Sequence, residues 1–163
     1  MKYEKVAVGG TFDYLHDGHK AILSKAFEIG KKVIVGVASD QMELRKDSAG
    51  IPPFGRRLAG LKEYLSKRGW LERAEFEKIS DPVGPAADIE GLGAIIVSGE
   101  TKSKAEEIND LRREKGFDAL DVIEIPYVMA DDGMPISSIR IRYGEIDKHG
   151  NIKTDGRRIY DSV

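Results

Sequence analysis

Short runs of β-branched residues alternate with segments of helical periodicity through most of the chain, and this alternation limits the fold more than any other feature. The segment 32–38 (KVIVGVA) is nearly continuous in apolar residues, as expected of a strand that is buried on both faces of a sheet. Further strands are predicted at 5–8, 75–79, 94–97 and 122–126, the last of them also as a buried strand. Strands separated by helices predict right-handed βαβ units. We therefore expect an α/β fold with a doubly wound parallel sheet and helices on both faces.

The segments between these strands carry helical patterns with defined ends. Asp17 to Ile29 has apolar residues at helical spacing, and Gly30 is expected to end this helix as a C-terminal cap. A second helix is predicted at 54–68. Two capping-box patterns predict further helix starts: Asp40 with Glu43, and Ser103 with Glu106. Near the C-terminus we expect a short helix after Ser137 and Ser138, then a hairpin at 148–151.

The size of the chain favours a single globular domain. With 163 residues it can bury roughly 70% of the surface of its unfolded chain, so it needs no disulfide or metal ion to fold. We expect this domain at 1–147, followed by a C-terminal tail at 148–163 of unassigned role. The absence of cysteine excludes thiol nucleophiles and cysteine-zinc sites.

The charge and hydropathy of the chain argue against nucleic acids and membranes as its binding partners. The formal net charge of −2 argues against a general nucleic-acid binder, which usually carries a basic excess. The N-terminus (MKYEKVAVGG) has no apolar run of signal-peptide length, and no later segment could span a membrane. We therefore expect a cytoplasmic protein that binds neither nucleic acid nor membrane, and the sequence does not indicate its oligomeric state.

The segment 9–19 (GGTFDYLHDGH) joins the first predicted strand to the first predicted helix. Free amide groups and the helix dipole make such a junction favourable for phosphate oxygens, and Gly10 and Gly18 let the backbone approach a ligand closely. His16 and His19 are three residues apart, so they face the same side of the helix and can both donate hydrogen bonds to a phosphorus centre that gains negative charge. Two other readings are that they only cap the helix, or that they bind a metal ion together with a third ligand.

This segment resembles the H-x-G-H signature of the nucleotidylyltransferase superfamily, which has a Rossmann-like fold. The segment 136–142 (ISSIRIR) is similar to the second signature of that superfamily, I-S-S-x-x-x-R. The resemblance implies transfer of a nucleoside monophosphate from ATP to a phosphate-bearing acceptor. In the second signature, Ser137 or Ser138 would cap a helix that faces the β- and γ-phosphates, with Arg140 or Arg142 adding positive charge.

Within the superfamily, the chain is most similar to the phosphopantetheine adenylyltransferases of the archaeal and eukaryotic type. Besides the two signatures, the segment 97–101 (VSGET) resembles the V-S-x-E-T element of that branch. The bacterial branch differs, since it has Thr where this chain has His16 and Arg-rich residues where this chain has 99–101. The resemblance implies that ATP and 4'-phosphopantetheine give dephospho-coenzyme A and pyrophosphate, with Mg²⁺ held mainly by the phosphates of ATP.

The resemblance also implies the residues of the site. His19 and Lys46 would be catalytic, with Arg45 as a rival of Lys46. Contacts to ATP would come from eight residues: Gly10, Thr11, Phe12, His16, His19, Ser137, Ser138 and Arg140. Contacts to the acceptor phosphate would come from Thr11, Lys46 and Arg57, with Arg56 as a rival of Arg57. No protein ligand to a metal ion is assigned, although Asp131 and Asp132 lie in a loop beside the second signature.

These residues suit an in-line transfer in which an acceptor phosphate oxygen attacks the α-phosphorus of ATP. A phosphate nucleophile is already ionised at neutral pH, so no general base is required, and the protein has to hold two polyanions together. Two alternatives remain at this point. One is another adenylyl- or cytidylyltransferase that uses FMN, glycerol 3-phosphate or nicotinamide mononucleotide, and the other is a non-catalytic nucleotide sensor.

Overall fold

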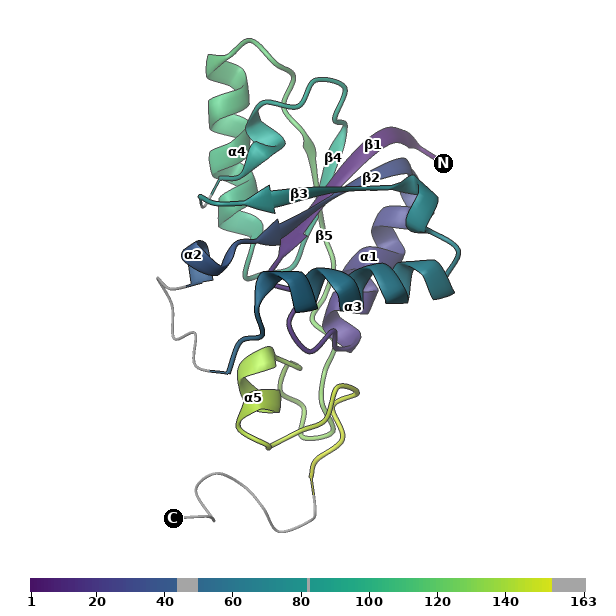
Figure 1. The fold of residues 1–163 in the computed structure, drawn as a ribbon. Coiled ribbons are helices and arrows are strands. Elements are labelled where there is room, and N and C mark those ends of the chain that lie inside the picture. Colours follow the sequence, from purple (N-terminus) through teal and green to yellow (C-terminus); the bar gives the residue numbers. More distant parts are fainter. Residues whose placement is uncertain (44–49, 82, 154–163) are drawn as a thin grey trace.

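A five-stranded, all-parallel sheet forms the centre of the molecule in the computed structural model, which describes residues 1–43, 50–81 and 83–153 (Figure 1). The strands lie in the order β3-β2-β1-β4-β5. Their bounds are β1 Tyr3–Gly10, β2 Gly30–Ala38, β3 Ala74–Ile79, β4 Ala94–Val97 and β5 Asp121–Glu124. All five predicted strands are therefore present, and each lies within two residues of its predicted bounds.

The strand order contains a reversal beside β1. The chain runs outward from β1 to β2 and β3, then crosses back to place β4 on the other side of β1, with Val6 opposite both Val33 and Ala94. In open parallel sheets, the crevice outside the carboxyl ends of the strands at such a reversal is where ligands bind. This rule places the expected site beyond the ends of β1 and β4.

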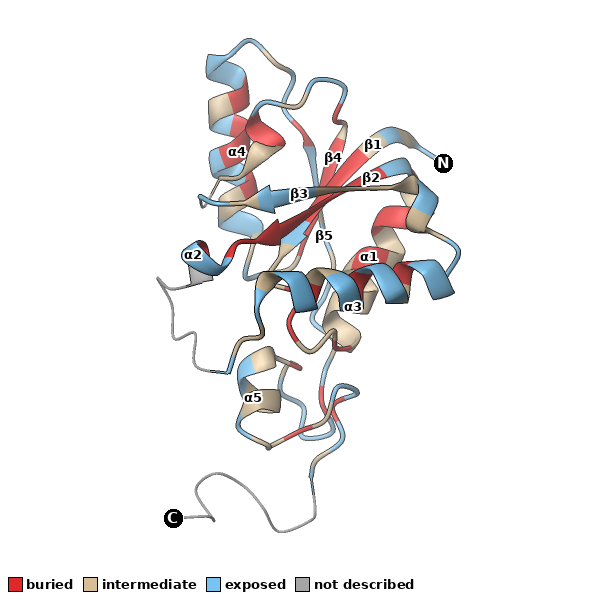
Figure 2. Cartoon of the chain, viewed as in Figure 1, coloured by how far each residue is buried: buried red, intermediate tan, exposed pale blue. Residues whose placement is uncertain are grey.

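Helices cover both faces of the sheet. On one face, α1 (Asp17–Ile29) and α3 (Phe54–Lys67) pack Leu23, Phe27 and Leu61 against alternate valines of β1 and β2. On the other face, α4 (Lys102–Glu114) packs Ala105 and Ile108 against the intervening residues of the strands. Figure 2 shows the result, in which β2 is almost entirely buried and the helices are buried only along the side toward the sheet. The predicted doubly wound, Rossmann-like fold is confirmed.

The predicted C-terminal cap of α1 at Gly30 is confirmed, since the Gly30 amide donates to the Ala26 carbonyl. Its backbone is extended, with φ of −110°, and it opens β2, where a Cβ atom would lie 2.7 Å from Val6 Cγ2. Three other details of the sequence interpretation are wrong. Ser39 rather than Asp40 caps α2 (Asp40–Glu43), since Ser39 Oγ accepts a hydrogen bond from the Met42 amide at 3.1 Å. Thr101, not Ser103, is the N-cap of α4. The strand predicted as buried near the C-terminus is β5, an edge strand with mostly exposed residues.

The C-terminal part of the described chain folds against the carboxyl end of the sheet. It contains the short helix α5 (Ser138–Arg142) and a small apolar cluster of Ala130, Ile136 and Ile146. An antiparallel bridge joins Ile146 to Ile152, which confirms the predicted hairpin. The turn of this hairpin contacts the start of α1, where the Asp17 amide donates to the Lys148 carbonyl at 3.0 Å.

Two 3-10 turns, η1 (Leu71–Arg73) and η2 (Pro85–Ala87), complete the elements. Within the described ranges, no helix has the length and apolar character needed to cross a membrane.

Candidate active site

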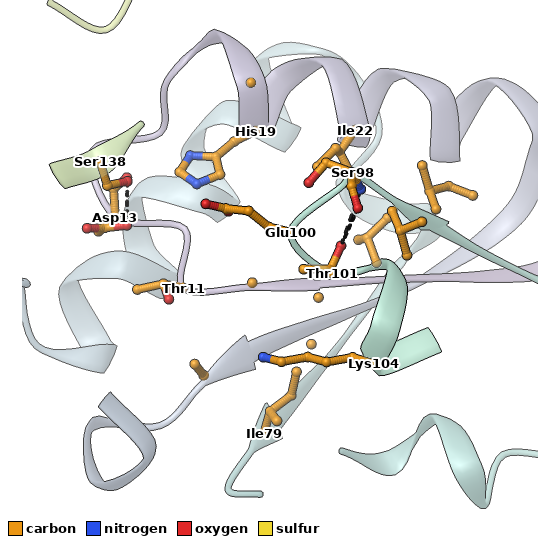
Figure 3. Close-up of a pocket in the computed structure, with 18 of the residues that line it drawn as sticks. Thr11, Asp13, His19, Ile22, Ile79, Ser98, Glu100, Thr101, Lys104 and Ser138 are labelled. Atoms are coloured by element: carbon orange, nitrogen blue, oxygen red, sulfur yellow. Dashed lines mark hydrogen bonds between the residues drawn. The ribbon is translucent and has the colours of Figure 1, made fainter. Parts of the chain in front are cut away.

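A cavity of about 750 Å³ lies beyond the carboxyl ends of β1, β2 and β4. Its polar lining comes from the loop after β1, the first turn of α1, the loop after β4 and the start of α5. Figure 3 shows Thr11, Asp13, His19, Glu100 and Ser138 around this space. The two signature segments, which lie at opposite ends of the sequence, therefore line one cavity.

The loop between β1 and α1 has an unusual backbone. Phe12 and Tyr14 have φ of 53° and 58°, which is a left-handed conformation that non-glycine residues rarely adopt. Such conformations cost on the order of 1 kcal/mol or more each and persist only where the surroundings hold them. Here the Phe12 side chain is buried, and the Tyr14 hydroxyl donates to the Gly50 carbonyl at 2.6 Å. The resulting tight turn brings Thr11 and Asp13 to the edge of the cavity.

His16 and His19 cap the first turn of α1 reciprocally. His16 Nδ1 accepts from the amides of Gly18 (3.0 Å) and His19 (3.3 Å), and His19 Nδ1 accepts from the His16 amide at 3.2 Å. The two rings stack with their centroids 3.7 Å apart. A neutral imidazole that accepts through Nδ1 carries its proton on Nε2. Capping thus sets the tautomer, and both rings can present an Nε2–H donor while they cap the helix.

Both histidines are neutral at physiological pH. Burial lowers the pKa of His16 to about 4, although the carboxylates of Asp13 and Asp17 act in the opposite direction. The pKa of His19 is lowered well below its ordinary value, first by burial and then by the neighbouring His16. A neutral histidine can still stabilise developing negative charge by donating a hydrogen bond, so this state suits the role that the sequence predicts.

These pKa values predict that the fold loses stability in mild acid. His16 has a folded-state pKa of about 4 against an ordinary value of 6.5, so between these values the unfolded chain binds more protons. The stabilisation is complete above pH 6.5 and is lost as the pH falls toward 4, by about 3 kcal/mol in total. Urea unfolding at several pH values measures this loss. His16→Asn keeps a strong N-cap residue without a titrating ring, and its acid-side loss should be clearly smaller. Equal losses in the two proteins would contradict the assignment.

Ser137 and Ser138 occupy the start of α5, as the second signature predicts. Ser137 Oγ accepts from the Arg140 amide at 3.3 Å and so caps the helix. Ser138 Oγ donates to the buried carboxylate of Asp13 at 2.8 Å, drawn in Figure 3. This hydrogen bond joins the two signature segments directly. Residues 125 positions apart are thereby held in a fixed relation across the cavity.

The two arginines of α5 differ in their surroundings. Arg142 lines the cavity, where its side chain is 9% exposed and one of its NH groups lies 3.6 Å from Asp13 Oδ2. Its buried Nε has no hydrogen-bond partner among the described residues. Arg140, the residue predicted for ATP, does not line the cavity, and its guanidinium instead forms ion pairs with Asp132 and Glu145. The structure therefore favours Arg142 as the cation of this signature.

Arg57, which was predicted to contact the acceptor phosphate, forms hydrogen bonds with other parts of the protein. Its side chain is buried below the loop after β1, outside the cavity lining. The guanidinium donates to the carbonyls of Pro52, Thr11 and Ala38, each at 2.8 Å, and to Asp40 at 3.0 Å. Arg57 thus ties the loop to the end of β2 and the start of α3, while its rival Arg56 is exposed on α3. These contacts give Arg57 a structural role, and its contact to the acceptor phosphate stays a prediction.

The cavity also contains charged residues that the sequence analysis did not assign to the site. Glu100 and Lys104, from the loop after β4 and the first turn of α4, both line it. The sequence feature that could have placed Lys104 on the inward side of α4 is its spacing, since it lies four residues before the buried Ile108. Lys46 and its rival Arg45 lie outside the described residues.

Comparison with known proteins gives the family. The model of the cytidylyltransferase-like family matches residues 7–144, which is most of the chain. The chain is 47% identical over 153 residues to a phosphopantetheine adenylyltransferase of Methanothermobacter thermautotrophicus, covering 93% of this chain and 90% of the relative. It is 46% identical to a phosphopantetheine adenylyltransferase of Pyrococcus abyssi, covering 93% and 96%. The chain belongs to the phosphopantetheine adenylyltransferase family. The resemblance found in its motifs is thereby confirmed.

Solved structures support the fold expected of phosphopantetheine adenylyltransferases. A protein of unknown function from Archaeoglobus fulgidus has a TM-score of 0.66 and 34% identity, covering 74% of this chain and 88% of that one. A tyrosyl-tRNA synthetase from the same organism has a TM-score of 0.64 over 85% of this chain and 59% of its own, at 14% identity. The second likeness shows the fold alone.

Proposed function

We propose that this nucleotidyltransferase transfers the adenylyl group of ATP to 4'-phosphopantetheine and so acts in coenzyme A synthesis. The family and the relatives named phosphopantetheine adenylyltransferase support this reaction. The observation that carries the proposal in the structure is the reciprocally capped pair of His16 and His19 at the edge of the cavity. A helix start with two neutral Nε2–H donors is suited to a phosphate whose charge grows during reaction.

The triphosphate of ATP would lie between α1 and α5. The first turn of α1 offers backbone amides, and the tight turn at Gly10, Thr11 and Phe12 offers close backbone approach. On the other side, Ser137 and Ser138 would meet the β- and γ-phosphates together with the guanidinium of Arg142. The unpartnered Nε of Arg142 supports this, because a buried donor without an acceptor is costly unless a ligand supplies one.

The chemical step would be a direct in-line displacement. An oxygen of the acceptor phosphate forms a bond to the α-phosphorus, the bond from the α-phosphorus to the bridging oxygen breaks, and pyrophosphate leaves with the electron pair. His19 would donate its Nε2–H to an α-phosphate oxygen as that oxygen gains charge. No proton has to be removed from the nucleophile, so a neutral histidine that cannot serve as a strong base is sufficient.

The acceptor would enter over the apolar side of the cavity. This side is lined by Ile34, Ile79, Val83, Ala86 and Ile95, which suit the uncharged arm of a pantetheine group. Thr11, at the border between the apolar and polar parts, would contact the acceptor phosphate. Lys46 stays the proposed catalytic lysine on the resemblance of its sequence position alone.

Magnesium would enter the site on ATP. No group of three or more histidine, aspartate or glutamate side chains that could hold a metal ion occurs among the residues described. Asp132 forms an ion pair with Arg140, and Asp13 accepts from Ser138. The donors present thus fit an ion that keeps phosphate and water ligands, as Mg²⁺ commonly does, and that neutralises part of the triphosphate charge.

A panel of acceptors tests the proposed function. Purified protein with ATP and Mg²⁺ is expected to release pyrophosphate with 4'-phosphopantetheine at a kcat/KM at least about a hundredfold above that with FMN, glycerol 3-phosphate or nicotinamide mononucleotide. The reason is that only the pantetheine arm can fill the apolar part of the cavity. Preference for another acceptor would overturn the substrate assignment and keep the transferase. Tight ATP binding without release of pyrophosphate for any acceptor would favour a nucleotide sensor.

A further inference from the structure

A lysine occupies the inward side of α4, where the neighbouring residues are apolar. Ala105 and Ile108 are buried against the sheet, and Lys104 lies beside them, half-buried, with its side chain in the cavity (Figure 3). Lysine is rarely placed in such a position unless its ammonium group reaches a polar partner.

The ammonium group of Lys104 has no ion pair or hydrogen bond within the described part of the chain. Glu100 also lines the cavity, but its carboxylate points toward His19 and away from Lys104 (Figure 3). Lys102 differs in this respect, because it is exposed and pairs with Glu124 at 3.3 Å outside the cavity. Lys104 is therefore a cation directed into the cavity, and none of the described residues supplies its counter-charge.

The cavity has two cationic side chains among the described residues that line it, and the reaction brings two polyanions together. Arg142 lies beside Ser138 and Asp13 at the α5 side, where the triphosphate is proposed to bind. Lys104 comes from α4 on the other face of the sheet, next to the apolar lining that includes Ile79 (Figure 3). Each side of the cavity thus has one of these cations, Arg142 on the α5 side and Lys104 on the α4 side.

We propose that Lys104 binds the phosphate group of the acceptor and so selects a phosphorylated acceptor over its unphosphorylated counterpart. This inference rests on the proposed function, and it adds to that function a substrate-binding residue outside both signature segments. The apolar lining beside Lys104 would hold the arm of the acceptor, and the ammonium group would hold its phosphate at the border with the ATP side. A compact ammonium group on a flexible stem suits a phosphate that must stay reactive.

Steady-state kinetics of Lys104→Met test the proposal, with Lys102→Met as the matched control. Methionine keeps most of the apolar stem and removes the charge, so the thermal midpoint should stay close to that of the unchanged protein. We expect the KM for 4'-phosphopantetheine to rise about tenfold to a hundredfold, and the KM for ATP to change less than about twofold. Lys104→Arg should recover part of the loss, and Lys102→Met should behave as the unchanged protein.

Binding measurements with phosphorylated and unphosphorylated acceptors isolate the contribution of the phosphate group to affinity. Calorimetry should show that the unchanged protein prefers 4'-phosphopantetheine to pantetheine, and that Lys104→Met loses most of this preference while binding pantetheine normally. A rise in the KM for ATP alone would place Lys104 on the nucleotide side, and unchanged constants would make it a solvated lysine; either result overturns the proposal. If the unchanged protein uses a different phosphorylated acceptor, the proposed function fails, and the same comparison with that acceptor still decides the role of Lys104.

Discussion

His19→Ala is expected to lower kcat about a hundredfold to a thousandfold, the usual cost of removing one donor to a developing oxyanion. The Nε2–H of His19 is set by the capping bond at Nδ1, and its hydrogen bond to the α-phosphate strengthens only as charge accumulates. ATP affinity should fall much less, because the backbone amides, Ser137, Ser138 and Arg142 would still hold the triphosphate. The measurement is kcat for pyrophosphate release together with the dissociation constant of ATP.

Removal of His19 also removes one capping bond, so a matched variant is needed. His19→Gln places an acceptor at the third helical position, as in an ordinary capping box, and should restore the stability of α1. If the loss of activity came only from the missing cap, glutamine would restore kcat. We expect it to restore the thermal midpoint and leave kcat far below that of the unchanged protein. A near-normal kcat in His19→Ala would contradict the catalytic role.

Arg57→Met is expected to give the largest loss of stability, about 3–5 kcal/mol. Methionine keeps the apolar stem but leaves the carbonyls of Pro52, Thr11 and Ala38 without their donor below the loop. A buried acceptor that loses a donor costs part or all of its desolvation penalty, and here three carbonyls lose the donors of Arg57 together. Activity should fall as well, since the guanidinium fixes the loop that carries Thr11.

Denaturant unfolding measures this effect, with Arg56→Met as the control. Arg56 is the exposed neighbour on α3, so its replacement should change the free energy of unfolding by less than about 0.5 kcal/mol. If Arg57→Met unfolds like the unchanged protein but has a raised KM for the acceptor, the role first predicted for Arg57 is right and the structural role is wrong.

The sequence predicts the strands and both signatures because these features are local. The buried part of a central parallel strand, such as residues 33–38 of β2, is a continuous apolar run, and the segment 9–19 contains its own turn, cap and histidines. The short helix after Ser137 is likewise predicted by its capping serine. These elements need no information from distant parts of the chain.

Two of the arginine and lysine assignments, those of Arg57 and Lys104, depend on the tertiary fold, so the sequence could not decide them. For the second signature the sequence held the signal, because the arginine of I-S-S-x-x-x-R falls on Arg142 and not on Arg140. The fold agrees with that register, since Arg140 forms ion pairs with Asp132 and Glu145, whereas Arg142 faces the cavity. Arg57 looked like a ligand contact, but three carbonyls from separate segments use its donors. Lys104 was missed because a lysine in a polar helix looks like solvated surface until the helix is packed.

Mass analysis of the acceptor tests the central claim most directly. When the protein is incubated with ATP, Mg²⁺ and 4'-phosphopantetheine, the acceptor should gain the mass of one adenylyl group, and one pyrophosphate should appear for each product molecule. The same reaction with His19→Ala should yield very little of either product. Formation of ADP, or release of AMP or phosphate with the acceptor unchanged, would contradict adenylyl transfer in this cavity.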